Sequence, residues 1–191
     1  MKATYITIVF CSLILASCSS EPSLQKYFVN HTEDANFISL DISPSILNID
    51  NKKLSSAEIK AFSTFEKMNI LAFKLEANNS AAFEQEQVNV QNILKAKKYN
   101  VLMKIGSGKQ GVAVSYLGTE DQVDEIIIFA KSKETGFAII RILGDQMTST
   151  DIMHFIQIVQ KSKIDLDQLK PLKEMMPKNN VNNDLSAKLK N

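Results

Sequence analysis

All six glycines of this 191-residue chain lie between positions 106 and 144, where they divide a Val- and Ile-rich stretch into short apolar runs. The runs read YNVLMKI, VAVSYL, EIIIFAKS and FAIIRIL, and the segments between them read GSGKQG, GTEDQVD and KETG. Short β-branched runs separated by Gly-containing turns are typical of consecutive hairpins. The sequence therefore predicts a four-stranded antiparallel meander in the C-terminal half of the chain.

The first separator also has the spacing of a nucleotide-binding loop, Gly106-x-Gly108-x-x-Gly111. A dinucleotide fingerprint needs a helix after the glycines, because the pyrophosphate rests on the N-terminus of that helix. Here the apolar run VAVSYL follows, and it has the character of a strand. A phosphate-binding P-loop would need Gly at 103 and Ser or Thr at 110, where the chain has Met103 and Gln110. We expect a hairpin loop and no bound nucleotide.

The N-terminal half predicts two further strands and several helices. Residues 36–43 (NFISLDIS) alternate in polarity as a strand does, and residues 69–75 (NILAFKL) form a second apolar run. Helices are expected from residue 24, from Ser55 with Ile59, Phe62 and Phe65 on one stripe, over 80–98, and from Thr148. The pattern predicts one α+β domain over residues 24–176, with a mostly antiparallel sheet and helices packed on one face. Residues 177–191 are rich in Asn and Lys and are predicted to be disordered.

The N-terminus has the form of a secretory signal. Lys2 precedes a mostly apolar run over residues 6–15, which is too short to span a bilayer comfortably. The segment Leu15-Ala16-Ser17-Cys18 is similar to a bacterial lipobox, in which the cysteine thiol receives a diacylglycerol before cleavage. We expect a signal peptide over 1–17, acylation of Cys18 and a tether over 18–23. The alternative is an ordinary secretory signal that contains a cysteine.

Charge and cysteine usage narrow the classes of partner. Removal of Lys2 with the signal leaves 22 − 1 = 21 basic side chains against 21 acidic ones. This balance argues against nucleic acid as a partner, which needs a basic face or stripe. Cys11 would also be removed, so the mature chain could form no internal disulfide. Ser19 is not the Asp that retains some lipoproteins at the inner membrane, so we expect a cell-envelope location at the outer membrane.

Polar residues in the predicted strands form the candidate binding face. Asp41, Lys74, Lys104 and Arg141 are each the polar member of an alternating segment. On an antiparallel sheet with helices on one side, such residues would gather on the other side. The alternative is a solvated face without a ligand, as antiparallel sheets commonly have.

The sequence offers no recognisable catalytic constellation, and we expect no catalytic residue, cofactor or metal. Its two histidines are His31 and His154, and no G-x-S-x-G nucleophile elbow occurs. A metal held by His31 with the carboxylates of residues 33 and 34 is a weaker interpretation. A hydrolase using carboxylates such as Asp41 and Asp50 also stays open, because paired carboxylates with separated pKa values can perform acid–base chemistry.

The whole-chain pattern resembles an uncharacterised family of Bacteroidota envelope lipoproteins, the DUF4252 family. The resemblance covers roughly residues 20–170 and rests on the lipobox, NFISLDIS followed by Pro44, NILAFKL and the glycine-bearing meander. It implies a link with envelope signalling and carries over no functional residues. We therefore expect a non-catalytic binding or signalling-accessory module, anchored through Cys18 and engaging an envelope protein or glycan.

Overall fold

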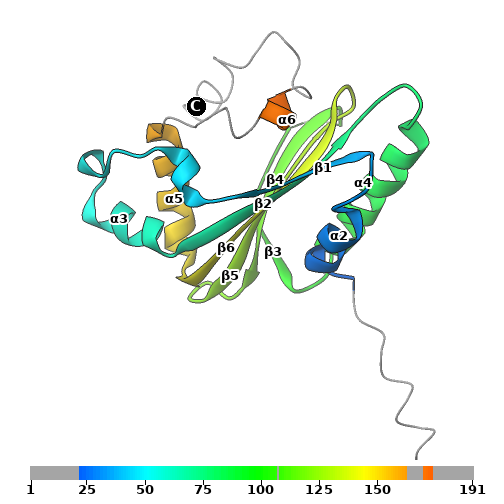
Figure 1. Cartoon of the computed structure of the whole chain (residues 1–191). Helices are drawn as coiled ribbons and strands as arrows, with labels where there is room; N and C mark the ends of the chain where they lie inside the picture. Colours follow the sequence, from blue (N-terminus) through cyan, green and yellow to red (C-terminus); the bar gives the residue numbers. More distant parts are fainter. Residues whose placement is uncertain (1–21, 107, 163–169, 174–191) are drawn as a thin grey trace, which may run out of the picture.

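Six antiparallel strands form one sheet in the order β1-β2-β6-β5-β4-β3 (Figure 1). The computed structural model describes residues 22–106, 108–162 and 170–173. The strands are β1 (Phe37–Ile42), β2 (Phe65–Lys74), β3 (Tyr99–Gly106), β4 (Gln110–Gly118), β5 (Val123–Ser132) and β6 (Gly136–Met147). Strands β3 to β6 form the predicted meander. Strand β2 pairs with β6, so β1 and β3 lie at the two edges of the sheet.

Two of the helices begin at capping residues that the sequence predicts. In α3 (Ser56–Ser63), Ser55 and Glu58 form a capping box, and in α5 (Ser149–Lys161) the Thr148 hydroxyl accepts from the Asp151 backbone N–H at 3.3 Å. The other helical elements are α2 (Leu24–His31), η2 (Pro44–Leu47), η3 (Asn51–Lys53), α4 (Ser80–Leu94) and α6 (Lys170–Lys173). The predicted α+β class with an antiparallel sheet is confirmed.

The helices differ from the expectation in one respect, because they cover both faces of the sheet. Figure 1 shows α2 and α4 on one side and α3 and α5 on the other. Adjacent strand residues point to opposite faces, yet Ile126 and Ile127 are both buried, as are Ile70 and Leu71. Ile70 and Ile126 pack in the α5 cluster, whereas Leu71 and Ile127 pack in the α2–α4 cluster. The continuous apolar runs ILAF and IIIF are the signature of strands buried on both faces.

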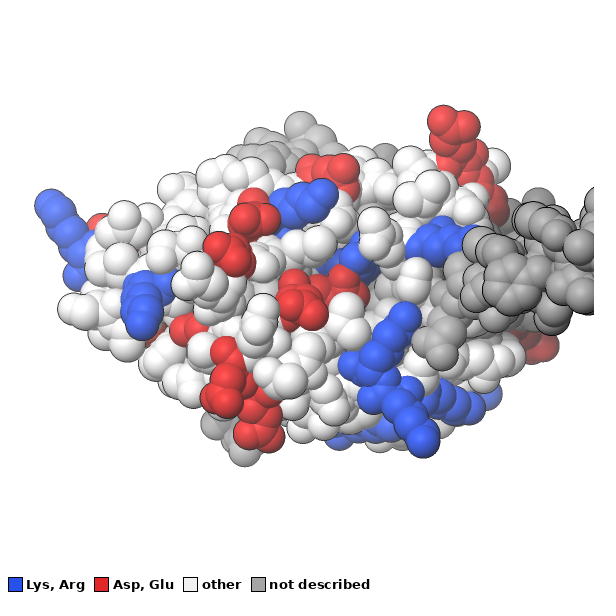
Figure 2. Space-filling view, turned by 90° about the horizontal axis from the view of Figure 1, so that it is seen from below, with Lys and Arg blue, Asp and Glu red and all other residues white. Residues whose placement is uncertain are grey.

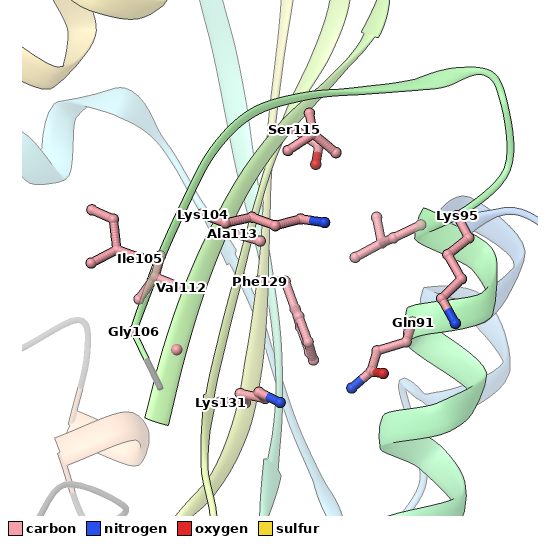
Figure 3. Close-up of a pocket in the computed structure, with 13 residues that line it drawn as sticks. Gln91, Lys95, Lys104, Ile105, Gly106, Val112, Ala113, Ser115, Phe129 and Lys131 are labelled. Atoms are coloured by element: carbon pink, nitrogen blue, oxygen red, sulfur yellow. The ribbon is translucent and has the colours of Figure 1, made fainter. Parts of the chain in front are cut away.

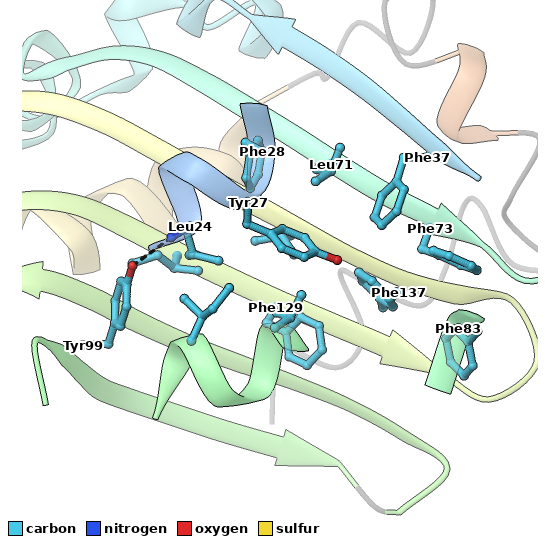
Figure 4. Packing of buried hydrophobic residues seen from close by; sticks show 14 residues of the cluster. Leu24, Tyr27, Phe28, Phe37, Leu71, Phe73, Phe83, Tyr99, Phe129 and Phe137 are labelled. Atoms are coloured by element: carbon cyan, nitrogen blue, oxygen red, sulfur yellow. Dashed lines mark hydrogen bonds between the residues drawn. The ribbon is translucent and has the colours of Figure 1, made fainter. Parts of the chain in front are cut away.

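Aromatic side chains dominate the core on the α2–α4 side (Figure 4). The rings of Phe73 and Phe137 stack with centroids 5.5 Å apart, and Phe83 of α4 packs within 6.0 Å of both. Tyr27 of α2 lies edge-on to Phe37 of β1 at 6.1 Å. This core attaches α2 and α4 to the sheet.

The boundary between α3 and β2 lies earlier than the periodicity predicts. The helix ends at Ser63, and Phe65 begins β2 with its ring 4.4 Å from that of Phe155 in α5. Ile59 is 45% exposed rather than buried, because α3 turns Glu58 and Ala61 inward. The predicted stripe of Ile59, Phe62 and Phe65 therefore does not exist as one helix face.

Candidate functional site

The structure does not bring the four residues of the predicted binding face together. Lys74 lies four residues after Ile70 on β2, so both side chains point to the same face of the sheet, the α5 side. There the Lys74 Nζ pairs with Glu76 Oε1 at 3.0 Å. Asp41, Arg141 and Lys104 belong to the α2–α4 side by register. Only Lys104 lines a groove on this face.

Arg141 is buried beneath α2. Its Nε donates to Glu125 Oε2 at 3.1 Å, Nη2 contacts the same oxygen, and Cζ lies 5.2 Å from the centroid of the Phe28 ring. Both partners of the ion pair are less than a tenth exposed. In the adjacent strands the Asn69 amide donates to Asp41 Oδ1. Arg141 is therefore part of the packing between α2 and the sheet, and no solvated sheet face exists at this position.

A partly open groove of about 340 Å³ lies between α4 and the strands β3, β4 and β5 (Figure 3). Its apolar lining includes Leu94 on α4, Val101 on β3, Ala113 on β4 and Phe129 on β5. In the close-up, Phe129 points toward the helix, whereas Ile105 and Val112 point to the other side of the sheet. The groove thus has an apolar floor supplied by alternate residues of three strands.

Three lysines from three elements line the same groove: Lys95 follows α4, Lys104 lies on β3 and Lys131 on β5. None of the thirteen lining residues is acidic. Among the described residues, none of these three ammonium groups forms an ion pair. The remaining polar lining includes Gln91 and Ser115, which are uncharged.

The cationic lining contrasts with the overall balance of charge in the chain, which has 22 basic and 21 acidic side chains. Figure 2 shows one face on which acidic and basic side chains are interspersed among uncharged ones, with a local group of basic side chains toward one end. A balanced chain has no general attraction for anions. A concave site that is lined by cationic and not by acidic side chains can therefore attract an anion, although the net charge of the chain does not.

A second polar cluster joins α2 to α4. Tyr27 Oη donates to Glu86 Oε2 at 2.7 Å, and the His31 ring lies 3.6 Å from the same carboxylate through Nε2 and 3.4 Å from Asp34 Oδ2 through Nδ1. Burial, followed by the bond to Glu86, raises the pKa of Tyr27. The Asn36 backbone N–H, which donates to Asp34, is the main cause that lowers the pKa of that carboxyl.

This cluster does not assemble the metal site considered from the sequence. His31 contacts Asp34 and Glu86, while Glu33 is exposed and takes no part. Within residues 22–106, 108–162 and 170–173, no group of three His, Cys, Asp or Glu side chains could hold a metal ion. The contacts instead fasten two helices to each other.

A family model described as a domain of unknown function, DUF4252, matches residues 27–155. The match is longer than half of the 191 residues. The chain belongs to the DUF4252 family. Neither the curated proteins nor the solved structures provide a match. The DUF4252 region extends from Tyr27 in α2 to Phe155 in α5, so it contains all six strands and the whole groove.

The residues of the predicted lipobox, Leu15, Ala16, Ser17 and Cys18, precede the DUF4252 region and lie outside the described residues, as does the predicted disordered tail over 177–191. No helix in the described part of the chain is long and apolar enough to cross a membrane. The glycine-rich loop connects β3 to β4, with Gly106 paired with Gly111 across the hairpin. The loop therefore lies between two strands, as predicted.

The two carboxylates considered for hydrolysis serve separate local roles in this DUF4252 domain. Asp41 lies on edge strand β1 beside Asn69. Asp50 caps η3, where Oδ1 accepts the Lys52 backbone N–H at 3.1 Å. Neither lines the groove between α4 and the sheet. No observation thus pairs them for acid–base work.

Proposed function

We propose that this DUF4252 chain is a non-catalytic binding or signalling-accessory module of the cell envelope, held at the membrane by an acylated Cys18. The groove between α4 and strands β3–β5 is its ligand site, and its ligand is an anionic component of the envelope. The observation that carries the proposal is the set of Lys95, Lys104 and Lys131 around an apolar floor without any acidic lining residue.

The electrostatics of the groove favour an anion. Three unpaired ammonium groups that share one concavity repel one another, and a bound anion relieves this repulsion. The apolar lining excludes part of the water that would otherwise screen the attraction. Each lysine at such a partly exposed position contributes modestly, so affinity depends on the three acting together.

The position of the groove suits a membrane-tethered protein. The Leu24 backbone N–H donates to Tyr99 Oη at 3.2 Å, which places the start of α2 against the start of β3. Val101 and Lys104 follow Tyr99 on that strand and line the groove. Leu24 lies only six residues after Cys18, a segment that spans at most about 20 Å when extended. An acylated Cys18 would thus keep the groove close to the lipid surface.

Replacement of the acylated residue tests the anchor. In the full chain, Cys18→Ser should abolish incorporation of a labelled acyl chain and move the protein from the membrane fraction to the aqueous fraction, because no other anchor is proposed. Ser17→Ala, which keeps a small residue before the cysteine, is the matched control and should still be acylated. Equal labelling of the wild-type and Cys18→Ser chains would contradict the anchor.

Charge reversal tests the groove. The Lys104→Glu/Lys131→Glu chain is expressed in its own cells and crosslinked there. The amount of anionic component that copurifies with it should be at least about fivefold lower than with the wild type. Two reversed charges convert attraction into repulsion, so the modest contributions of the two lysines to the binding free energy add up to about 1–2 kcal/mol. Lys67→Glu on β2, also an exposed lysine, should leave recovery unchanged. Equal recovery from all three chains would contradict the groove as the site.

A further inference from the structure

We infer that the ligand of the groove is a single-chain anionic amphiphile, such as the carboxylate of a medium-length acyl chain. This inference rests on the proposed function, because it assigns a chemical class to the ligand of the same site. The groove separates two kinds of lining, apolar side chains on its floor and cationic or neutral polar side chains around them. An amphiphile has the matching division between tail and headgroup.

The floor provides the contacts for an apolar tail. Phe129 is only 6% exposed, and Leu94 and Ala113 are partly exposed beside it, so a slender chain could cover the apolar surface that remains open. Val101 is 50% exposed at the β3 side of the groove. Removal of such apolar surface from water stabilises a complex in proportion to the area covered.

Ser115 supplies a neutral hydrogen-bond donor in the lining of the groove. It is only 4% exposed, it forms no side-chain hydrogen bond among the described residues, and its hydroxyl points toward the space occupied by the groove (Figure 3). Its Oγ is accessible from the groove rather than sealed in the core, and a hydroxyl can donate one hydrogen bond. A carboxylate oxygen held by Lys104 could accept a hydrogen bond from this hydroxyl.

The volume of the groove favours a ligand with one acyl chain over a ligand with two. About 340 Å³ lies near the lower end of the roughly 300–1,000 Å³ that ligand pockets occupy. The groove is also partly open, so the headgroup can stay in contact with water while the tail lies on the floor. These features match a small amphiphile better than a diacyl lipid.

An added peptide strand fits the same region less well. Strand β3 is an edge of the sheet and could in principle pair with an extended peptide. Its register shifts between Val101 and Met103, however, and such an irregularity interrupts the ladder that a peptide would extend. The groove lies on the face of the sheet toward α4, where side chains rather than backbone groups are presented.

Titration calorimetry with decanoate below its micellar concentration tests this inference, with the full chain carrying Cys18→Ser. Decanoate should bind at one site per chain, whereas butyrate, which lacks the tail, and decylamine, which has the opposite charge, should bind at least about tenfold more weakly. Lys104→Glu/Lys131→Glu should weaken decanoate binding by about tenfold or more, and Lys67→Glu should not.

A larger side chain in the floor of the groove tests the contact with the apolar tail separately. Ala113→Leu fills the floor and should weaken decanoate binding at least about fivefold, while Ala82→Leu, at an exposed position of α4 outside the groove, should leave it unchanged. Circular dichroism would establish that both variants are folded. Equal binding of decanoate and butyrate, equal binding of decanoate and decylamine, or attachment only to anionic vesicles would each overturn the inference. If decanoate fails to bind while recovery from cells still depends on Lys104 and Lys131, the ligand class is wrong and the proposed function stands.

Discussion

Replacement of Gly136 by alanine is expected to destabilise the domain by more than about 3 kcal/mol, because strain and a backbone clash coincide there. Gly136 has φ +123°, a conformation that residues with a side chain rarely adopt. A Cβ atom at this position would lie 1.9 Å from the Phe73 carbonyl oxygen and 3.0 Å from the Leu75 nitrogen. Phe73 lies on the paired strand β2 and Leu75 directly follows it, and both obstacles are backbone atoms, so relief requires the β2–β6 pairing to separate.

Gly108 provides the matched control for this substitution. A Cβ atom there would meet nothing within 4 Å, so Gly108→Ala should change the free energy of unfolding by less than about 0.5 kcal/mol. Urea denaturation of the two variants measures the difference. Similar midpoints for Gly136→Ala and Gly108→Ala would show that β6 does not approach β2 as closely as described.

Replacement of Arg141 by methionine is expected to destabilise the fold by about 3–5 kcal/mol, because it leaves a buried charge without its partner. The Glu125 carboxylate is 6% exposed and receives its side-chain hydrogen bonds from Arg141. Methionine retains most of the packing against Phe28 but donates no hydrogen bond. Denaturant unfolding gives the loss directly.

The double variant Arg141→Met/Glu125→Leu separates the lost partner from lost packing. Apolar replacement of both members of a buried ion pair is often neutral, so the double variant should regain most of the stability that the single variant loses. If the double variant is as unstable as Arg141→Met alone, the loss arises from packing beneath α2 and the charge argument is wrong.

The local signals in the sequence predicted much of the fold. The glycine-separated runs predicted β3 to β6, and the capping box at Ser55 predicted the start of α3. The order of the strands in the sheet could not be predicted from the sequence. The pairing of β2 with β6 joins segments some seventy residues apart, and it depends on the shared core rather than on any local pattern. The prediction of helices on one face was wrong, although the run IIIF lacks the alternation that a solvated face requires.

The candidate site was predictable only in part. Lys104 was identified because it is polar within an apolar strand, but the same criterion selected Arg141, whose partner Glu125 precedes an apolar run on a different strand. A polar residue in a strand can face water or a buried partner, and periodicity does not distinguish the two. Lys95 and Lys131 join Lys104 only because α4 packs across β3 to β5, and that arrangement carries no sequence signal.

Photo-crosslinking from inside the groove shows whether a ligand binds there in cells. A photoreactive residue at Gln91, which lines the groove, is compared in intact cells with one at Ala82, which lies on the same helix outside it. We expect an adduct of defined mass from position 91 and no such adduct from position 82. The adduct from position 91 should be lost in the Lys104→Glu/Lys131→Glu chain and retained in the Lys67→Glu chain. Equal adducts from positions 91 and 82, or an adduct unaffected by reversal of Lys104 and Lys131, would contradict the groove as the ligand site.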